Sequence, residues 1–170
     1  MGLTPLDQLL AKQDITESLY RYCRALDRMD LALAHSVWHD NATVDYGEYF
    51  QGSAEAFIIW VWDSHKAMAS HSHQISNVLI ELSGNAARSE AYVTVGMRRI
   101  LPSGCAMDTT NRGRYLDRWS RHDGVWLIDD RHFVRDFRST YPKASAATSA
   151  SSAGWGFRDT GDPSYLFLRN

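Results

Sequence analysis

The sequence predicts an α+β domain in which helices cover one face of a curved antiparallel sheet. Apolar residues recur at helical spacing early in the chain, at Ile15, Leu19, Tyr22 and Leu26, and form one stripe. Later in the chain, long stretches typical of strands alternate with short turns that contain glycine. Helices followed by a meander of strands are typical of this fold class.

Three helices are predicted from their start signals. The first begins at Thr4–Pro5, where a capping residue precedes a proline that fits the first turn. A short second helix is predicted over Leu31–Trp38, with Asp30 as its cap. A third is predicted over Ala54–Ala69, with Ser53 as its cap.

The strands follow from alternation and from turn residues. Ala42, Val44 and Tyr46 alternate with polar residues, which predicts a short strand that ends at Gly47. Turns then separate four longer predicted strands, over His71–Leu82, Ala86–Leu101, Cys105–Ser120 and Val125–Phe137.

The composition divides the chain into three segments. Residues 1–138 carry all the predicted helices and strands and form the domain. Residues 139–153 are rich in Ala and Ser, which is typical of a linker. Residues 154–170 regain aromatic side chains, and we expect this segment to dock on the domain or on a neighbouring subunit.

Charge and hydropathy exclude several classes of protein. The net charge is −2 and no predicted helix carries a basic stripe, so nucleic-acid binding is not expected. Arginines between Arg112 and Arg138 alternate with aspartates, which we interpret as mixed charge on exposed strand faces. The longest apolar run, Ala56–Trp62, is too short to cross a bilayer, and the N-terminus lacks the apolar region of a signal peptide. Two cysteines without a CxxC partner add to the expectation of a cytoplasmic protein with no membrane association.

Two histidines carry the chemistry that the residues themselves suggest. His71 and His73 lie two apart on a predicted strand, so both point to the same face. No spaced Cys/His set supplies the remaining ligands of a zinc ion, so no metal site is expected. Two interpretations remain. One of the two histidines acts as a general base, or the histidines are structural, with hydrogen bonds to the backbone and water. A base needs a carboxylate partner, and Asp27, at the edge of the first helix's buried face, is one candidate among several.

An ordered set of motifs resembles the SnoaL-like branch of the nuclear transport factor 2-like superfamily over residues 5–138. The motifs are Tyr20–Asp27 with Asp30, His73–Glu81, Tyr115–Trp119 and Asp123–Trp126. The resemblance implies a cone-shaped, strongly curved antiparallel sheet wrapped by N-terminal helices, a cystatin-like α+β barrel that encloses one deep pocket. The enzymes of this group include scytalone dehydratase, hexachlorocyclohexane dehydrochlorinase, bile-acid 7α-dehydratase and polyketide cyclases.

The resemblance also implies catalytic roles. In the dehydratase-like and dehydrochlorinase-like members, an aspartate near the end of the first helix orients a strand histidine that removes a proton. Asp27 matches that aspartate, and His73 matches the histidine because Asn77 follows it by four residues; His71 does not match. Tyr22 matches a position that assists the leaving group, with packing in the core as its alternative.

Four further residues are expected to bind the substrate. Trp38, Tyr46, Asn77 and Arg114 are assigned this role, and a core position is the alternative for Trp38. A basic residue on the later strands completes the site in some relatives, and Arg112 and Arg118 are the alternatives to Arg114.

The function implied is that of a cofactor-independent lyase acting on a small aromatic or polycyclic hydroxylated compound. The His–Asp dyad would remove a proton, with loss of water, of another small leaving group, or of formaldehyde by retro-aldol-type cleavage. No GxGxxG or P-loop motif is present, so no cofactor is expected. The alternatives are an isomerase or cyclase with the same first step, and a non-catalytic small subunit of a ring-hydroxylating dioxygenase. We expect a homo-oligomer, a dimer or a trimer.

Overall fold

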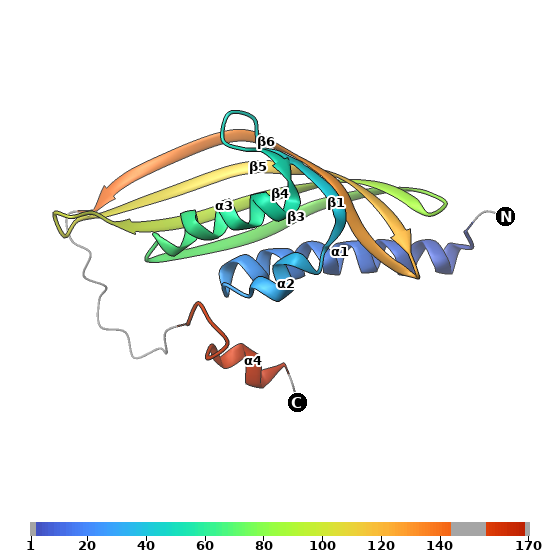
Figure 1. The fold of residues 1–170 in the computed structure, drawn as a ribbon, viewed down its shortest axis with the longest axis horizontal. Coiled ribbons are helices and arrows are strands. Elements are labelled where there is room, and N and C mark those ends of the chain that lie inside the picture. Colours follow the sequence, from blue (N-terminus) through green and yellow to red (C-terminus); the bar gives the residue numbers. More distant parts are fainter. Residues whose placement is uncertain (1–2, 144–155, 169–170) are drawn as a thin grey trace.

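Three helices lie under the concave side of an arched sheet (Figure 1). This is a computed structural model, which describes residues 3–143 and 156–168 of the 170-residue chain. The helices are α1 (Pro5–Asp27), α2 (Leu31–His35) and α3 (Ala54–Lys66), and a short α4 (Pro163–Phe167) lies near the C-terminus. The predicted α+β class is confirmed.

The sheet has six strands in the order β2-β1-β6-β5-β4-β3. Their bounds are β1 (Trp38–Asp45), β2 (Gln51–Ser53), β3 (Ser70–Ser83), β4 (Ala86–Ile100), β5 (Ala106–His122) and β6 (Val125–Lys143). Neighbouring strands are antiparallel except β1 and β6, which are parallel. The sheet is therefore mixed rather than wholly antiparallel. A parallel pair needs a long crossover, and residues 46–124 between these two strands supply it.

Local signals set the start of α1, but not the end of α2. Thr4 and Asp7 form a capping box, in which the Thr4 hydroxyl accepts a hydrogen bond from the backbone N–H of Asp7 at 3.2 Å. The prediction that α2 extends to Trp38 is wrong, because the helix ends at His35 and Trp38 opens β1. Trp38 pairs with Ile128 of β6, a distant strand that residues 31–38 alone do not reveal.

The predicted boundaries near the C-terminus also shift. Strand β6 continues past 138 to Lys143, so residues 139–143 of the predicted linker belong to the sheet. The remainder of that linker, residues 144–153, lies outside the described residues. Residues 156–168 contact the end of α1: Arg28 donates a hydrogen bond to the Phe157 carbonyl oxygen at 3.0 Å, and the Tyr165 hydroxyl donates to Asp30 at 2.8 Å.

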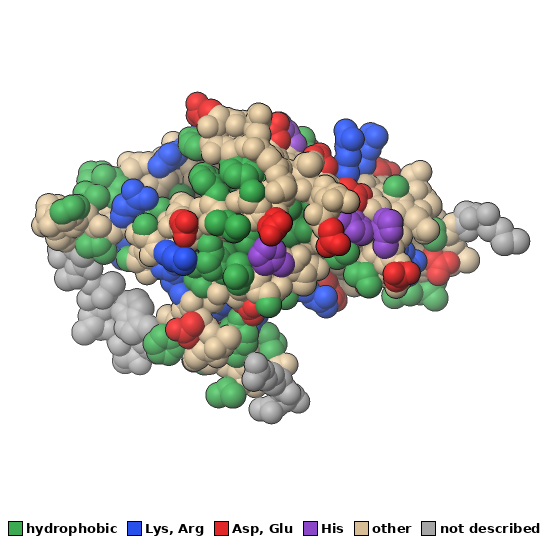
Figure 2. All heavy atoms as spheres, viewed as in Figure 1, with side chains coloured by type: hydrophobic (Ala, Val, Ile, Leu, Met, Phe, Trp, Pro, Cys, Tyr) green, Lys and Arg blue, Asp and Glu red, His purple; other side chains and the backbone are tan. Residues whose placement is uncertain are grey.

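The face of the molecule shown in Figure 2 carries hydrophobic side chains near its centre, while acidic and basic side chains are scattered over it without gathering by sign. Among residues 3–143 and 156–168, no helix combines the length and apolar character needed to cross a membrane.

Glycine is required at one position of the sheet. A register shift between Arg112 and Gly113 brings the backbone of β6 close to β5. A Cβ atom on Gly113 would lie within 2.7 Å of the Phe133 ring and closer still to the Val134 carbonyl oxygen. The absence of a side chain at Gly113 therefore lets Phe133 pack where it does.

We expect Gly113→Ala to destabilise the fold by about 1–3 kcal/mol, the usual cost of overpacking a tightly packed site. Urea unfolding followed by circular dichroism measures it. Gly96→Ala in β4 is the matched control, because its Cβ would meet only the Ser72 hydroxyl at 3.7 Å, an ordinary contact. Equal losses in the two variants would contradict the steric explanation.

Candidate active site

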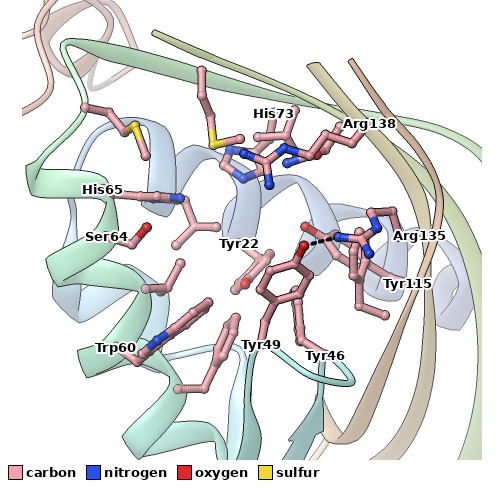
Figure 3. Close-up of a pocket in the computed structure, with 18 of the residues that line it drawn as sticks. Tyr22, Tyr46, Tyr49, Trp60, Ser64, His65, His73, Tyr115, Arg135 and Arg138 are labelled. Atoms are coloured by element: carbon pink, nitrogen blue, oxygen red, sulfur yellow. Dashed lines mark hydrogen bonds between the residues drawn. The ribbon is translucent and has the colours of Figure 1, made fainter. Parts of the chain in front are cut away.

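A cavity of about 260 Å³ lies between α3, α1 and the concave face of the sheet (Figure 3). Most of its lining is apolar or aromatic: Tyr22, Leu26, Tyr46, Tyr49, Phe57, Trp60, Val61, Met68, Val95, Met97, Tyr115 and Phe133. The polar lining residues are Ser64, His65, His73, Arg99, Asn111, Arg135 and Arg138. An apolar cavity with a few converging polar groups is the usual form of a small-molecule site.

His73 and Asp27 form a tight pair at this cavity. The Nδ1 atom of His73 lies 2.6 Å from Oδ1 of Asp27, and the backbone N–H of His73 donates to Oδ2 at 2.9 Å. The His73 side chain is only 4% exposed and that of Asp27 14%, so water weakens the pair little. The Asp27 carboxylate accepts a hydrogen bond, so the proton of the neutral imidazole is on Nδ1. Nε2 is then the nitrogen with a free lone pair.

The end of α1 and the start of β3 hold this pair in place. Asp27 is the last residue of α1, and His73 is in β3. The neighbouring residues are joined as well, since Nε2 of His71 lies 2.8 Å from the Leu26 carbonyl oxygen. His71 is thus joined to the backbone through Nε2, with no partner for its buried Nδ1 among the described residues, while His73 takes the carboxylate.

Residues 7–132 match the protein family described as the SnoaL-like domain, and this range is most of the chain. The chain belongs to the SnoaL-like family. The predicted placement in the SnoaL-like branch of the nuclear transport factor 2-like superfamily is confirmed. No protein of the curated collections matches the sequence.

Solved structures share the SnoaL-like fold at low sequence identity. A protein from Novosphingobium aromaticivorans DSM 12444, provisionally named a scytalone dehydratase, is 19% identical with a TM-score of 0.70, over 86% of this chain and 97% of that chain. The hexachlorocyclohexane dehydrochlorinase LinA-type3 from Novosphingobium barchaimii LL02 is 17% identical with a TM-score of 0.72, over 87% and 100% of the two chains. A cystatin-like protein of unknown function from Nostoc punctiforme PCC 73102 is 20% identical with a TM-score of 0.57, over 80% and 96%. At these identities the likeness concerns the fold.

A third histidine of this SnoaL-like site lies beside the pair. The His65 ring centre is 4.2 Å from that of His71 and 5.7 Å from that of His73. Burial, and then the neighbouring His71, His73 and Arg158, lower the pKa of His65 to about 2. His65 is therefore a neutral imidazole at physiological pH, able to make hydrogen bonds but not to act as a base there.

We expect the stability of the fold to decrease as the pH falls below about 6.5, the ordinary histidine pKa. Below that pH the unfolded chain binds a proton at His65, whereas the folded chain stays neutral there down to about pH 2. The loss from this residue between pH 6.5 and 5 is up to about 2 kcal/mol. Burial also lowers the pKa of His71, which acts in the same direction.

Urea unfolding at pH 7.5 and 5 measures this dependence. His65→Gln is expected to flatten it, while His35→Gln, at an exposed site on α2, leaves it unchanged. The same slope in wild type and His65→Gln would contradict the assignment.

The tyrosines of the cavity are neutral donors. Burial raises the pKa of Tyr22, Tyr46 and Tyr115 well above the ordinary value. Tyr22 lines the cavity, and the interaction of its buried hydroxyl with that of Tyr46 contributes to its raised pKa.

A buried ion pair lies behind these rings. Arg131 donates two hydrogen bonds to Asp117, both at 2.7 Å, and both side chains are 0% exposed. The guanidinium carbon is 4.4 Å from the Tyr22 ring centre and 3.9 Å from that of Tyr115. Burial opposes the charge of Arg131, but the attraction of Asp117 outweighs it and holds the pKa of Arg131 well above its ordinary value. The interpretation of these strand charges as wholly exposed is therefore wrong at this pair.

The structure brings four of the predicted site residues together. Tyr22, Tyr46 and His73 line the cavity, and Asp27 holds His73 from behind. Tyr49, Phe57 and Trp60 also line it. Their catalytic and binding roles stay predictions.

Three predicted substrate-binding residues lie outside the cavity lining. Trp38 is buried and packs edge-on against Tyr22, with ring centres 5.6 Å apart, which is the core position given as its alternative. Asn77 is exposed at an irregularity of β3, with a φ of 47°. Arg114 is joined to carboxylates, at 3.1 Å from Asp136. Side chains alternate along β5, so Asn111 and Tyr115 face the cavity while the even-numbered arginines, including the alternatives Arg112 and Arg118, do not line it.

Several lining residues were missed in the sequence. Ser64 and His65 belong to a helix whose rotation the sequence alone does not fix. Phe133 and Arg135 lie two apart on a predicted strand, a spacing that could have placed them on one face. Arg138 lies beyond the predicted end of that strand.

Proposed function

We propose that the chain is a cofactor-independent lyase that acts on a small aromatic or polycyclic hydroxylated compound. The observation that carries this proposal is the Asp27–His73 pair at an apolar cavity. Two structural neighbours are named as a dehydratase and a dehydrochlorinase, and both names describe eliminations. They add support to the same reaction type.

In the proposed step, Nε2 of His73 removes a proton from a substrate carbon. The electrons of that C–H bond form a C=C bond, and the C–O bond to the neighbouring carbon breaks. The hydroxide leaves as water when a proton is returned to it, from the neutral Tyr22 hydroxyl or from the imidazolium. Asp27 accepts a hydrogen bond from Nδ1–H throughout and stabilises the imidazolium that forms.

Loss of formaldehyde uses the same base on a different proton. His73 would remove the proton of a hydroxymethyl O–H group, the C–C bond would break to give formaldehyde, and the substrate carbon would take up a proton. An isomerase or cyclase would also begin with proton removal by the dyad and would keep the substrate mass.

The aromatic walls support an aromatic substrate. Tyr46 stacks on Phe57 with ring centres 4.6 Å apart and on Phe133 at 4.9 Å. Trp60 extends from α3 on the opposite side of the cavity from β6 (Figure 3). Flat rings favour offset stacking on such walls.

Incubation with a panel of aromatic alcohols and phenolic dimers, followed by mass spectrometry and a formaldehyde assay, tests the proposal. We expect protein pretreated with a chelator to give a product lighter than the substrate by one water, or to release formaldehyde. Products of unchanged mass would assign an isomerase or cyclase instead. Turnover that is lost with the chelator and restored by a metal ion would contradict the cofactor-independent mechanism.

A further inference from the structure

The charged side chains that line the cavity are all arginines. Arg99 of β4 and Arg135 and Arg138 of β6 line it, and no Asp or Glu among the described residues does. Figure 3 shows Arg135 and Arg138 on the side of the cavity opposite Ser64 and Trp60 of α3. Arg135 and Arg138 therefore lie across the cavity from Trp60.

These arginines keep most of their charge uncompensated. Arg135 donates to the Tyr49 hydroxyl and lies 3.5 Å from Glu48, a long contact to an exposed carboxylate. Arg99 and Arg138 make no hydrogen bond or ion pair within the described ranges 3–143 and 156–168.

The neighbouring strand positions show the opposite pattern. Arg98, adjacent to Arg99 in β4, is held by Asp108 through two hydrogen bonds of 2.6 and 2.7 Å. Arg114, on the outward side of β5, contacts both Glu90 and Asp136. Arg98 and Arg114 are thus neutralised by carboxylates, whereas Arg99 and Arg138, which line the cavity, are left available.

The other titratable groups of the cavity do not cancel this charge. His65 is neutral, and Asp27 already has both oxygens on His73. The tyrosines are protonated. The whole chain has a net charge of −2, so the positive charge at the exposed rim of the cavity is a local feature and not a general excess of basic residues.

We propose that the cavity takes an aromatic substrate that carries a carboxylate, with Arg135 and Arg138 as the carboxylate-binding group. A guanidinium presents parallel N–H donors that match the two oxygens of a carboxylate. The ring system lies on the aromatic wall of Tyr46, Phe57 and Trp60, which leaves the hydroxylated carbon between the two ends, near His73. The inference rests on the proposed function only in calling this ligand a substrate; the anion site stands on the arginines alone.

Isothermal titration calorimetry with two probes of nearly the same shape tests the proposal. Naphthalene-2-carboxylate carries the charge, and naphthalene-2-carboxamide is its neutral counterpart. We expect the carboxylate to bind at least tenfold more tightly than the amide at 20 mM salt, and the ratio to fall at 500 mM salt because exposed charges are screened.

Two variants test whether the preference for the carboxylate over the amide arises in the cavity. In Arg135→Gln/Arg138→Gln the ratio of the two affinities should fall below threefold, while Arg21→Gln, an exposed arginine on α1, keeps it. Equal affinities in wild type, no binding of the carboxylate at millimolar concentration, or an unchanged ratio in the double variant would overturn the proposal.

The catalytic proposal and this one fail in different ways. His73→Ala should keep the carboxylate preference, because the arginines and the aromatic wall are intact. A His73→Ala protein with full turnover would remove the catalytic assignment and leave the anion site standing. A preference that disappears in His73→Ala would contradict the assignment to the arginines.

Discussion

We expect His73→Ala to lower turnover of the substrate by about 10²–10⁴-fold, the usual contribution of a general base. The substitution removes Nε2, the nitrogen with a free lone pair at the cavity, and neither neighbouring histidine takes its place, because burial lowers the pKa of both His65 and His71. Steady-state kinetics on the substrate found by product analysis measures the loss.

We expect Asp27→Asn to cause a loss of similar size by a different route. An asparagine can present its NH₂ group to Nδ1, which then accepts a hydrogen bond and leaves the proton on Nε2. The imidazole would still be in place but in the tautomer that cannot act as a base.

The controls separate chemistry from folding. His35→Ala and Asp14→Asn change exposed residues of the same types on α2 and α1, and both should keep full turnover. Circular dichroism should show the wild-type fold in all four variants. A correctly folded His73→Ala protein with full turnover would contradict the mechanism.

The sequence predicted those parts of the fold that local interactions determine. Thr4 starts α1 through a capping box made by neighbours three residues apart. Gly84, Gly104 and Gly124 adopt a positive φ in the turns that separate the long strands. Strand β2 was missed because Gln51–Ser53 is too short for a pattern, and it forms by pairing with β1.

The candidate site was predictable only where a motif or a periodicity points to it. The spacing of His71 and His73 put both on one face, but the residues alone left open which of them takes a carboxylate. In the structure the two histidines bind different groups of α1. His71 contacts a backbone carbonyl oxygen, and His73 contacts the Asp27 side chain. Arg138 could not be found, because its strand extends past the last patterned residue through pairing with β5.

The buried ion pair is the clearest case in which sequence and structure differ, and it carries the second large expected effect. We expect Arg131→Met to destabilise the fold by about 3–5 kcal/mol, because Asp117 would be left without a partner in the core, where burial already raises the pKa of its carboxyl. The variant also removes the cation from the rings of Tyr22 and Tyr115, whose positions form part of the cavity. Thermal unfolding should show a fall in Tm of roughly 10 °C.

The double variant Arg131→Met/Asp117→Leu identifies the cause. Removing both charges leaves no uncompensated ion, so we expect it to recover most of the stability lost in Arg131→Met. Arg118→Gln, an exposed arginine on β5, should change Tm little. If the double variant is no more stable than Arg131→Met, the loss comes from the contacts of the guanidinium with the aromatic rings and not from an unpaired Asp117.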